Sequence, residues 1–375
     1  METKPTVAIF RMKLLPPSEV FIREQCEALK AWRPLYAGWR RVPGLELPED
    51  RTVVLPGRSF LYRLTRNGKL VDAPLREKQA QVMHAQFEEG GIEALPIAKS
   101  LGIPLVTTFR GYDVTVADAF LRPNPFLRQM YLRRRRVLQR EGRLFLGVSG
   151  FIRKKMIERG YPEERCQVHY NGVNIARFKP NPANPVRRPI VLFCGRLVEK
   201  KGCEYVIRAT AELQETVPDV ELVVIGDGPL RPKLELLAKE KLRKASFLSS
   251  LTSEQVRGWM DAARVFSIAS VTASNGDSEG LPNVIVEAMA TGLPVVSFDH
   301  AGIGEAVLHG KTGFLAPEHS WRELATGYAT LFKDQACWEQ FSLTGREHVA
   351  ATFDQVKQTQ RLEGIYEALS KEGRK

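Results

Sequence analysis

Two glutamates, Glu279 and Glu287, frame the nine-residue segment E-G-L-P-N-V-I-V-E. Pro suits the first turn of a helix, so Pro282 predicts a compact apolar helix over residues 283–290. The turn that opens this helix is made by Gly280, Leu281, Pro282 and Asn283. Its unpaired backbone N–H groups would attract an anion, because the positive end of the helix dipole lies behind them.

The two carboxylates would lie at different depths in such a site. Glu279 precedes the helix and would stand at its mouth. Glu287 falls about one and a half turns inside, where a carboxylate can accept hydrogen bonds from vicinal hydroxyls of a ribose or a sugar ring. The alternative is a helix cap with two surface charges, which the apolar neighbours Ile285, Val286 and Ala288 make a poor fit. The segment indicates a nucleotide or sugar site.

Two further loops offer groups for the same ligand. The stretch 194–202, C-G-R-L-V-E-K-K-G, follows a strand-like run. It contains Gly195, Arg196 and Lys201. Its cations would neutralise a diphosphate. An ordinary basic strand–helix loop is the plain alternative. A second turn, Gly226-Asp227-Gly228, also follows a strand-like run, and could equally be a tight turn without a ligand.

Neither loop matches the best-known nucleotide motifs. G-x-x-x-x-G-K-[ST] is absent, and so is G-x-G-x-x-G with an acidic residue about twenty positions on. A P-loop nucleotidase and a dinucleotide dehydrogenase are therefore poorly supported.

Alternating strand and helix patterns would place these residues. Expected strands are residues 7–10, 52–55, 104–109, 144–148, 190–194, 221–225, 264–268 and 294–298. Expected helices are residues 19–32, 91–101, 126–139, 203–216, 230–243, 252–262 and 283–290. This alternation predicts an α/β protein with parallel sheets, in which ligands bind at the carboxyl ends of the strands.

A proline-rich stretch suggests where one domain ends. Four prolines between residues 178 and 189 exclude a helix interior or a central strand. We expect an N-terminal domain (1–178), a linker (179–189) and a C-terminal domain (190–353), two doubly wound Rossmann-like domains facing a cleft where a donor and an acceptor could meet. A helix over about 354–375 should pack back on the first domain.

The charge and the composition limit the classes of binding partner that we expect. The net charge is +12, and residues 122–159 hold twelve Lys or Arg against Glu141 and Glu158. Such a face attracts nucleic acid, an anionic membrane or phosphorylated ligands, or is simply solvated. No nucleic-acid-binding signature accompanies it, so we expect a membrane surface and no nucleic acid. Five scattered cysteines, no metal-site spacing, no signal peptide and no spanning segment favour the cytoplasm, with peripheral attachment to the inner face of the cell membrane.

The residues 279–287 and their continuation A-M-A-T-G-L-P-V-V resemble the E-x7-E signature of family-four retaining glycosyltransferases, which have the GT-B fold. The segment 170–178, the loop G-R-L…K-G at 195–202 and the turns at 226–229 and 310–315 are similar to others of that family. Segments 18–22, 83–87 and 107–113 look like its bacterial exopolysaccharide and colanic-acid branch.

The resemblance implies roles for residues of both domains. Arg196 and Lys201 would hold the diphosphate of a UDP- or GDP-sugar, Glu279 the transferred sugar and Glu287 the ribose, with no metal or other cofactor. In the first domain His84, Arg110 and Asp113 are candidates for the acceptor side, although a His at a strand end is more often structural. This chain has Arg110 where the family often has His, and Gly302-Ile-Gly-Glu305 where it has Gly-Ile-Pro-Glu.

The implied function is hexose transfer, with retention of configuration, to a glycan or lipid-pyrophosphate-linked acceptor in cell-surface polysaccharide synthesis. A non-catalytic nucleotide- or glycan-binding protein on the same scaffold is the alternative, because Arg110 cannot shuttle a proton near neutral pH.

Overall fold

The computed structural model describes residues 4–16, 19–55, 60–181 and 187–372. The chain divides into two compact units: unit 1 comprises residues 1–172 and 355–375, and unit 2 comprises residues 173–354. The division therefore falls at residues 172 and 354, whereas the sequence suggested 178 and 353. Residues 182–186 of the expected linker lie outside the described residues, and so does Ser18 of the segment 18–22.

Unit 1 contains a seven-stranded parallel sheet in the order β5-β3-β1-β6-β7-β8-β9. Its strands are β1 (Thr6–Phe10), β3 (Arg33–Gly38), β5 (Thr52–Val54), β6 (Ala80–Gln86), β7 (Leu105–Phe109), β8 (Leu144–Gly147) and β9 (Cys166–Val168). A separate pair joins β2 (Lys13–Leu14) to β4 (Arg40–Arg41). The strand order reverses beside β1, which is the doubly wound pattern.

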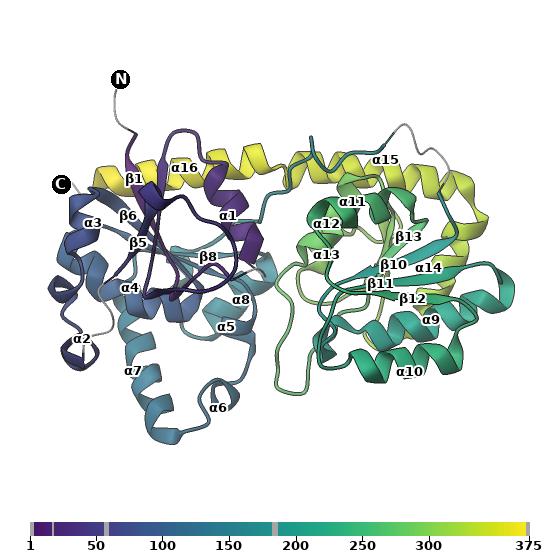
Figure 1. The fold of residues 1–375 in the computed structure, drawn as a ribbon, viewed down its shortest axis with the longest axis horizontal. Helices are drawn as coiled ribbons and strands as arrows, with labels where there is room; N and C mark the ends of the chain where they lie inside the picture. The colour runs from purple at the N-terminus through teal and green to yellow at the C-terminus, as the bar shows by residue number, and fades with distance from the viewer. Residues whose placement is uncertain (1–3, 17–18, 56–59, 182–186, 373–375) are drawn as a thin grey trace. The chain divides into compact units, whose positions relative to one another are not determined.

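Helices cover both faces of this sheet (Figure 1). They are α1 (Val20–Glu27), α2 (Phe60–Thr65), α3 (Ala73–Glu77), α4 (Phe87–Leu101), α5 (Tyr112–Thr115), α6 (Asp118–Leu121), α7 (Pro125–Glu141), α8 (Gly150–Glu158) and α16 (Gln355–Glu372), with 3-10 turns η2 (Glu49–Arg51), η3 (Gly68–Leu70) and η4 (Glu163–Arg165). No helix in the described ranges is both long and apolar enough to cross a membrane.

The last helix of the chain, α16, belongs to unit 1. Its Leu362, Tyr366 and Leu369 pack into one core with side chains from β1, β6 and β7. The carboxylate of Glu363 accepts the backbone N–H groups of residues 30–32 at 2.7, 2.6 and 3.2 Å. These N–H groups therefore do not continue α1, which explains why that helix ends at Glu27 and not at residue 32.

Unit 2 has a six-stranded parallel sheet in the order β12-β11-β10-β13-β14-β15. Its strands are β10 (Ile190–Cys194), β11 (Glu221–Ile225), β12 (Ala245–Leu248), β13 (Val265–Ile268), β14 (Val295–Phe298) and β15 (Gly313–Ala316). Its helices are η5 (Glu199–Lys201), α9 (Cys203–Thr216), α10 (Arg231–Lys241), α11 (Ser253–Ala262), α12 (Asn283–Ala290), α13 (Ile303–Ala306), α14 (Trp321–Lys333) and α15 (Gln335–Thr352). The predicted doubly wound α/β class is confirmed in each unit.

We expect Tyr366→Phe to destabilise unit 1. The Tyr366 hydroxyl lies 2.6 Å from Nδ1 of His84, and both side chains are buried. Removing it leaves a buried ring nitrogen without its partner, at a cost of about 1–3 kcal/mol. Calorimetry should show the unfolding midpoint of unit 1 falling by roughly 2–10 °C.

Tyr205→Phe in unit 2 is the matched control. Tyr205 makes a similar 2.6 Å contact with Nδ1 of His319, but this pair is exposed and water can replace it. Equal losses of midpoint in the two variants would contradict the prediction.

Candidate active site

The loops that follow β10 and β11 lie directly against each other in unit 2. The N–H of Gly195 donates to the carbonyl of Ile225 at 2.9 Å, and that of Leu197 to Asp227 at 2.8 Å. Gly226 has φ +135°, and a Cβ on it would stand 2.1 Å from the Gly195 carbonyl oxygen. Only glycine permits this approach. The predicted loops thus meet at the carboxyl edge of the sheet.

The neighbouring Asp227 and Gly228 have structural contacts in this turn. The exposed Asp227 carboxylate lies 3.5 Å from the Arg231 guanidinium, and the Gly228 carbonyl accepts the Arg231 N–H at 3.1 Å. Their predicted role in donor binding stays a prediction.

The η5 turn is held against the end of β13. Gly202, which closes the turn, has φ +61°, and a Cβ on it would lie 1.7 Å from the Ala269 carbonyl oxygen. The Glu199 carboxylate accepts the N–H and the hydroxyl of Ser274 at 3.0 and 2.9 Å. These contacts fix the long loop between β13 and α12 beside the lysines of η5.

Two sequence-predicted catalytic residues meet in this place. Nζ of Lys201 lies 3.1 Å from Oε1 of Glu279, and Nζ of Lys200 lies 3.6 Å from the same oxygen. Lys200 also bonds Asp277 at 3.0 Å. Glu279 is only 8% exposed, so the carboxylate expected at an open mouth is in fact buried between two ammonium groups.

The lysines decide the charge state of Glu279. Burial alone would raise the pKa of its carboxyl, but the positive charges of Lys201 and Lys200 outweigh burial and hold that pKa below its usual value. The Lys200 ammonium also loses solvation on burial, yet Glu279 and Asp277 raise its pKa. Glu279 is therefore ionised and Lys200 protonated near neutral pH.

Several buried polar atoms beside this cluster have no hydrogen bond among the described residues. They are Oγ of Ser270, Oε1 of Glu279 and Nε2 of His300. The Glu279 oxygen is compensated by the ammonium groups of both lysines, whereas Ser270 and His300 have no such partner for these atoms in the described residues. Buried polar atoms are rarely left unsatisfied in folded proteins, so their concentration at the strand ends is what a site for a hydroxyl-bearing ligand requires.

Sequence reasoning did not identify His300 or its partner. His300 follows β14, is 3% exposed, and its Nδ1 lies 2.7 Å from Oε1 of Glu318. It is near enough to Glu279 to lower the pKa of that carboxyl. The sequence offered one signal that His300 belongs to the site, which is its position just after an expected strand of the parallel sheet. Asp277 was missed because charges on a loop are usually solvated, and Lys200 was predicted as a cation of the loop 194–202 but not as a partner of Glu279.

Helix α12 begins as predicted at Asn283, although Pro282 occupies the N-cap and not the first turn. Gly280, Leu281 and Pro282 are buried, while Asn283 and Glu287 are part-buried. Burial, reinforced by the negative charge of Glu287, raises the pKa of the Cys194 thiol to about 12 against the influence of Lys201. The charges of Glu287 and Lys201 therefore act on the same thiol at the end of β10 in opposite directions.

Arg196 is not part of the ion-pair cluster. Its side chain is exposed, and within the described part of the chain its guanidinium has no ion pair or hydrogen bond. The structure thus brings Glu279, Lys201 and Glu287 to the end of the sheet and leaves Arg196 available to an external anion.

In unit 1, His84 lies inside β6 and not at an open strand end. Its side chain is 1% exposed, and its nitrogens lie 2.6 Å from the Tyr366 hydroxyl and 2.7 Å from Oγ1 of Thr108. Burial lowers its pKa to about 3. A neutral histidine with both nitrogens bonded in the core fits the structural interpretation, and it has no group left for an acceptor.

Arg110 and Asp113 are also engaged within unit 1. The Arg110 guanidinium bonds the side-chain oxygens of Gln86 and Asn171 at 2.7 Å each and stacks on the Phe21 ring at 4.5 Å. Burial lowers its pKa to about 10. Asp113 accepts three backbone N–H groups, all at 3.1 Å, and burial raises its pKa to about 6. Both side chains shape the ends of β6 and β7.

Comparison with known proteins gives two matching family models. The model described as Glycosyltransferase Family 4 matches residues 19–177, and that described as Glycosyl transferases group 1 matches residues 188–334. A protein of Escherichia coli K12 named as the colanic acid biosynthesis glycosyltransferase WcaL is 31% identical over 78% of this chain and 71% of its own length. The amylovoran biosynthesis glycosyltransferase AmsK of Erwinia amylovora is 33% identical over 61% of this chain and 57% of its own.

Solved structures agree on the fold. Alr3699/HepE of Anabaena, solved in complex with UDP-glucose, has a TM-score of 0.79 at 21% identity and covers 97% of this chain and 100% of its own. Sucrose-phosphate synthase from Thermosynechococcus elongatus has a TM-score of 0.78 at 20% identity, with 98% and 99% covered. These neighbours are GT-B glycosyltransferases, and the chain belongs to glycosyltransferase family 4.

Proposed function

We propose that this chain is a retaining hexosyltransferase of bacterial cell-surface polysaccharide synthesis, with a UDP- or GDP-sugar as donor and a glycan or lipid-pyrophosphate-linked acceptor. Its relatives WcaL and AmsK are named for exopolysaccharide synthesis, and HepE was solved with UDP-glucose. The observation that carries the proposal is Glu279, a buried carboxylate held by Lys200 and Lys201 at the carboxyl edge of a parallel sheet.

The site residues divide the donor between them. Lys201 and the exposed Arg196 neutralise the diphosphate, which makes a metal ion unnecessary, and Glu287 accepts hydrogen bonds from the ribose. The N-terminus of α12 adds backbone N–H groups and its dipole. Glu279 contacts the transferred sugar. Lys200 keeps its partner Asp277 and continues to compensate Glu279 when the diphosphate attracts Lys201.

These assigned roles lead to the following course for the sugar transfer. The bond between the anomeric carbon and the diphosphate oxygen breaks, and its electron pair leaves with the diphosphate. An acceptor hydroxyl oxygen bonds to the same face of the sugar, and its proton passes to the departing phosphate oxygen. Preorganised positive charge lowers the barrier because negative charge develops on the leaving group.

The cognate donor should raise the unfolding midpoint of the protein. Binding to the native state alone stabilises it by mass action, by about 2.7 kcal/mol at a hundredfold excess over Kd. A thermal-shift screen of UDP- and GDP-hexoses measures this, with the free hexoses as controls that should give no shift. A panel without any stabilising nucleotide sugar would contradict the proposed donor class.

Glu279→Ala should abolish sugar transfer and leave the fold intact. The variant removes the carboxylate that we place nearest the transferred sugar, while Lys200 keeps its ion pair with Asp277 at 3.0 Å. Product formation with the cognate donor, followed by chromatography, should fall at least a thousandfold, and circular dichroism should be unchanged. Full activity would exclude this site. Donor binding without turnover by the wild-type chain would identify the protein as a nucleotide-sugar-binding protein.

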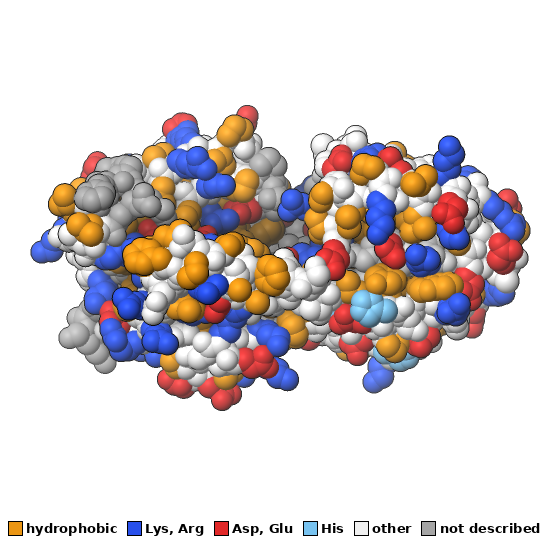
Figure 2. All heavy atoms as spheres, turned by 90° about the horizontal axis from the view of Figure 1, so that it is seen from below, with side chains coloured by type: hydrophobic (Ala, Val, Ile, Leu, Met, Phe, Trp, Pro, Cys, Tyr) orange, Lys and Arg blue, Asp and Glu red, His pale blue; other side chains and the backbone are white. Residues whose placement is uncertain are grey.

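The proposed membrane contact involves α7 and α6. Phe120 and Phe126 are 61% and 75% exposed, and Arg133 and Arg136 are exposed on the same segment of the chain. Figure 2 shows hydrophobic side chains interspersed with Lys and Arg on unit 1. Arg135, in contrast, is 5% exposed and bonds Glu88 at 2.9 Å and Asp118 at 2.7 Å. The arginines at 133–136 therefore do not all lie on one exposed surface.

Replacing Arg133 and Arg136 by Gln should weaken binding to vesicles that contain anionic lipid. Each basic residue near such a surface contributes about 1 kcal/mol, so the double variant should lose roughly thirtyfold in a sedimentation assay. The charge-conserving double Lys variant is the control and should bind like the wild type. Unchanged binding of the Gln variant would remove the membrane role of this face.

A further inference from the structure

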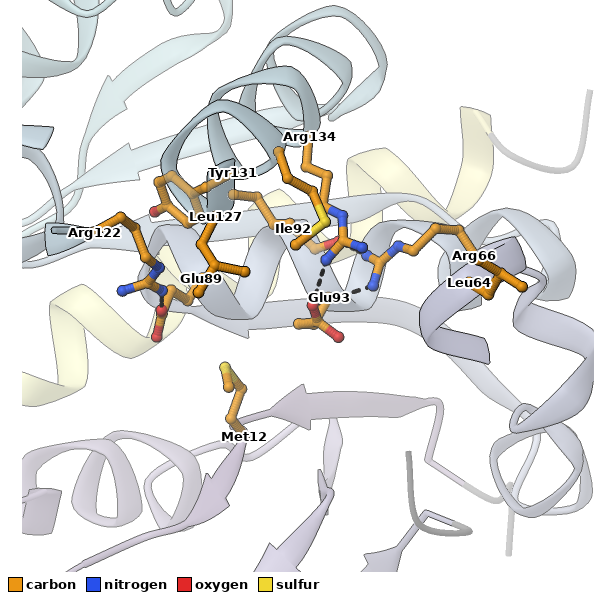
Figure 3. A pocket seen from close by; sticks show the side chains of 11 residues that line it. Met12, Leu64, Arg66, Glu89, Ile92, Glu93, Arg122, Leu127, Tyr131 and Arg134 are labelled. Carbon is orange, nitrogen blue, oxygen red and sulfur yellow. Dashed lines mark hydrogen bonds and ion pairs between the residues drawn. The ribbon is translucent and has the colours of Figure 1, made fainter. Parts of the chain in front are cut away.

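Unit 1 contains a pocket of ≈ 550 Å³ that has no role so far. Figure 3 shows it between α4, α7 and the Met12 segment, with Leu64 and Arg66 at one end. Its size is that of a site for a small molecule or a few sugar rings. Two carboxylates and three guanidinium groups line it together with aliphatic side chains.

Two helices supply most of the lining through a regular spacing. On α7 these residues are Leu127, Met130, Tyr131 and Arg134, and on α4 they are Glu89, Ile92 and Glu93. Positions three and four apart lie on one face of a helix, so each helix turns a single stripe toward the pocket. Arg133 does not line this pocket; it lines a separate hollow with Arg128 and Arg136.

The charges of the pocket nearly balance. Arg66 lies 3.1 Å from Oε1 of Glu93, and Arg134 lies 3.8 Å from the same oxygen. Figure 3 shows these two guanidinium groups converging on Glu93. Arg122 is paired with Glu89. Each guanidinium therefore faces a carboxylate, and Glu93, at 6% exposed, is held within the wall.

This balance points to the class of ligand. A phosphate or pyrophosphate would meet the negative charges of Glu89 and Glu93 and would have to break existing ion pairs. A polyhydroxylated ligand can use both kinds of group, because its hydroxyls donate to carboxylates and accept from guanidinium N–H groups. The aliphatic side chains Ile92 and Met130 suit the C–H faces of sugar rings.

The pocket also lies where a ligand is expected in this fold. Glu89 is in the first turn of α4, which follows β6, and Met12 follows β1. Ligands of open α/β sheets bind outside the carboxyl ends of the strands. A smaller hollow shares Glu89, Arg122 and Tyr131 with the pocket and reaches Asp113.

We propose that this pocket binds the uncharged sugar residues of the acceptor glycan, with Arg134, Arg122 and Glu89 as the groups that contact their hydroxyls. The inference rests on the proposed function, since it names the acceptor chemistry of that enzyme. It places glycan recognition away from His84, Arg110 and Asp113, whose side chains bond within unit 1.

The test is ligand-observed NMR on the full chain. The probes are neutral methyl glycosides and disaccharides of glucose, galactose, mannose and fucose, with inorganic pyrophosphate and farnesyl diphosphate as anionic probes. The variants are Arg134→Leu and Glu89→Gln, and the control is Arg133→Leu, which removes the same charge one residue away on another face of α7. Should Arg134→Leu fail to fold, Arg134→Lys replaces it, because it keeps the charge and loses the planar fork.

At least one neutral probe should bind the wild type and Arg133→Leu equally, and Arg134→Leu and Glu89→Gln should weaken it at least fivefold. Equal binding by all variants, or binding of the anionic probes alone, would overturn the proposal. So would the absence of binding by every neutral probe.

This result can be separated from a failure of the proposed function. The stabilisation of unit 2 by the nucleotide sugar should be the same in Arg134→Leu as in the wild type. If Glu279→Ala retained transfer, the proposed function would fail whatever the NMR result. If Glu279→Ala abolished transfer and the pocket variants bound sugars normally, only the pocket assignment would fail.

Discussion

The ion pair between Glu279 and the two lysines of η5 sets the charge balance of the site in unit 2. A buried carboxylate is costly unless opposite charges compensate it. Lys201 and Lys200 can do so only because the η5 turn lies against the end of β13, an approach that Gly202 permits. Asp277 and Glu199 then hold the following loop in place. The same cluster presents cations where a diphosphate would arrive.

If the proposed function holds, the sharing of Lys201 between Glu279 and the diphosphate would link donor binding to catalysis. Without a donor, Lys201 stabilises Glu279, and a bound diphosphate would compete for that ammonium group. Lys200 then remains as the partner that keeps the carboxylate ionised. His300 and Glu318 add a second buried pair on the next loop. Unit 1 has a different organisation, because Arg110 and Asp113 there support the turns around β6 and β7.

The sequence was most informative where local pattern and tertiary structure agree. Helix 283–290 and the strands 190–194 and 221–225 were predicted with the observed bounds, because apolar periodicity and a flanking proline or glycine mark them. The strand β6 was missed since A-Q-V-M-H-A-Q has few β-branched residues and several polar ones. Its His84 and Gln86 are tolerated because partners far along the chain, Tyr366 and Arg110, bond them.

The site residues, like the strands, could be predicted where local pattern marks them and not where distant contacts decide. Glu279 and Glu287 could be predicted as site candidates from their positions before and inside the helix 283–290, and Lys201 from its position in the loop after β10. The burial of Glu279, its pairing with Lys200 and the partnership of His300 with Glu318 could not be predicted, because they depend on which loops meet at the sheet edge. For a similar reason the buried Arg135 could not be told from the exposed Arg133 within a run of four arginines.

The most direct test of the central claim is the Kd of the nucleoside diphosphate, measured by calorimetry for the wild type, Lys201→Ala and Glu279→Ala. Lys201→Ala should weaken binding at least tenfold, because it removes a cation that meets the diphosphate. Glu279→Ala should bind at least as tightly as the wild type, because Lys201 is then free of its competing carboxylate. Wild-type affinity in Lys201→Ala would contradict the account.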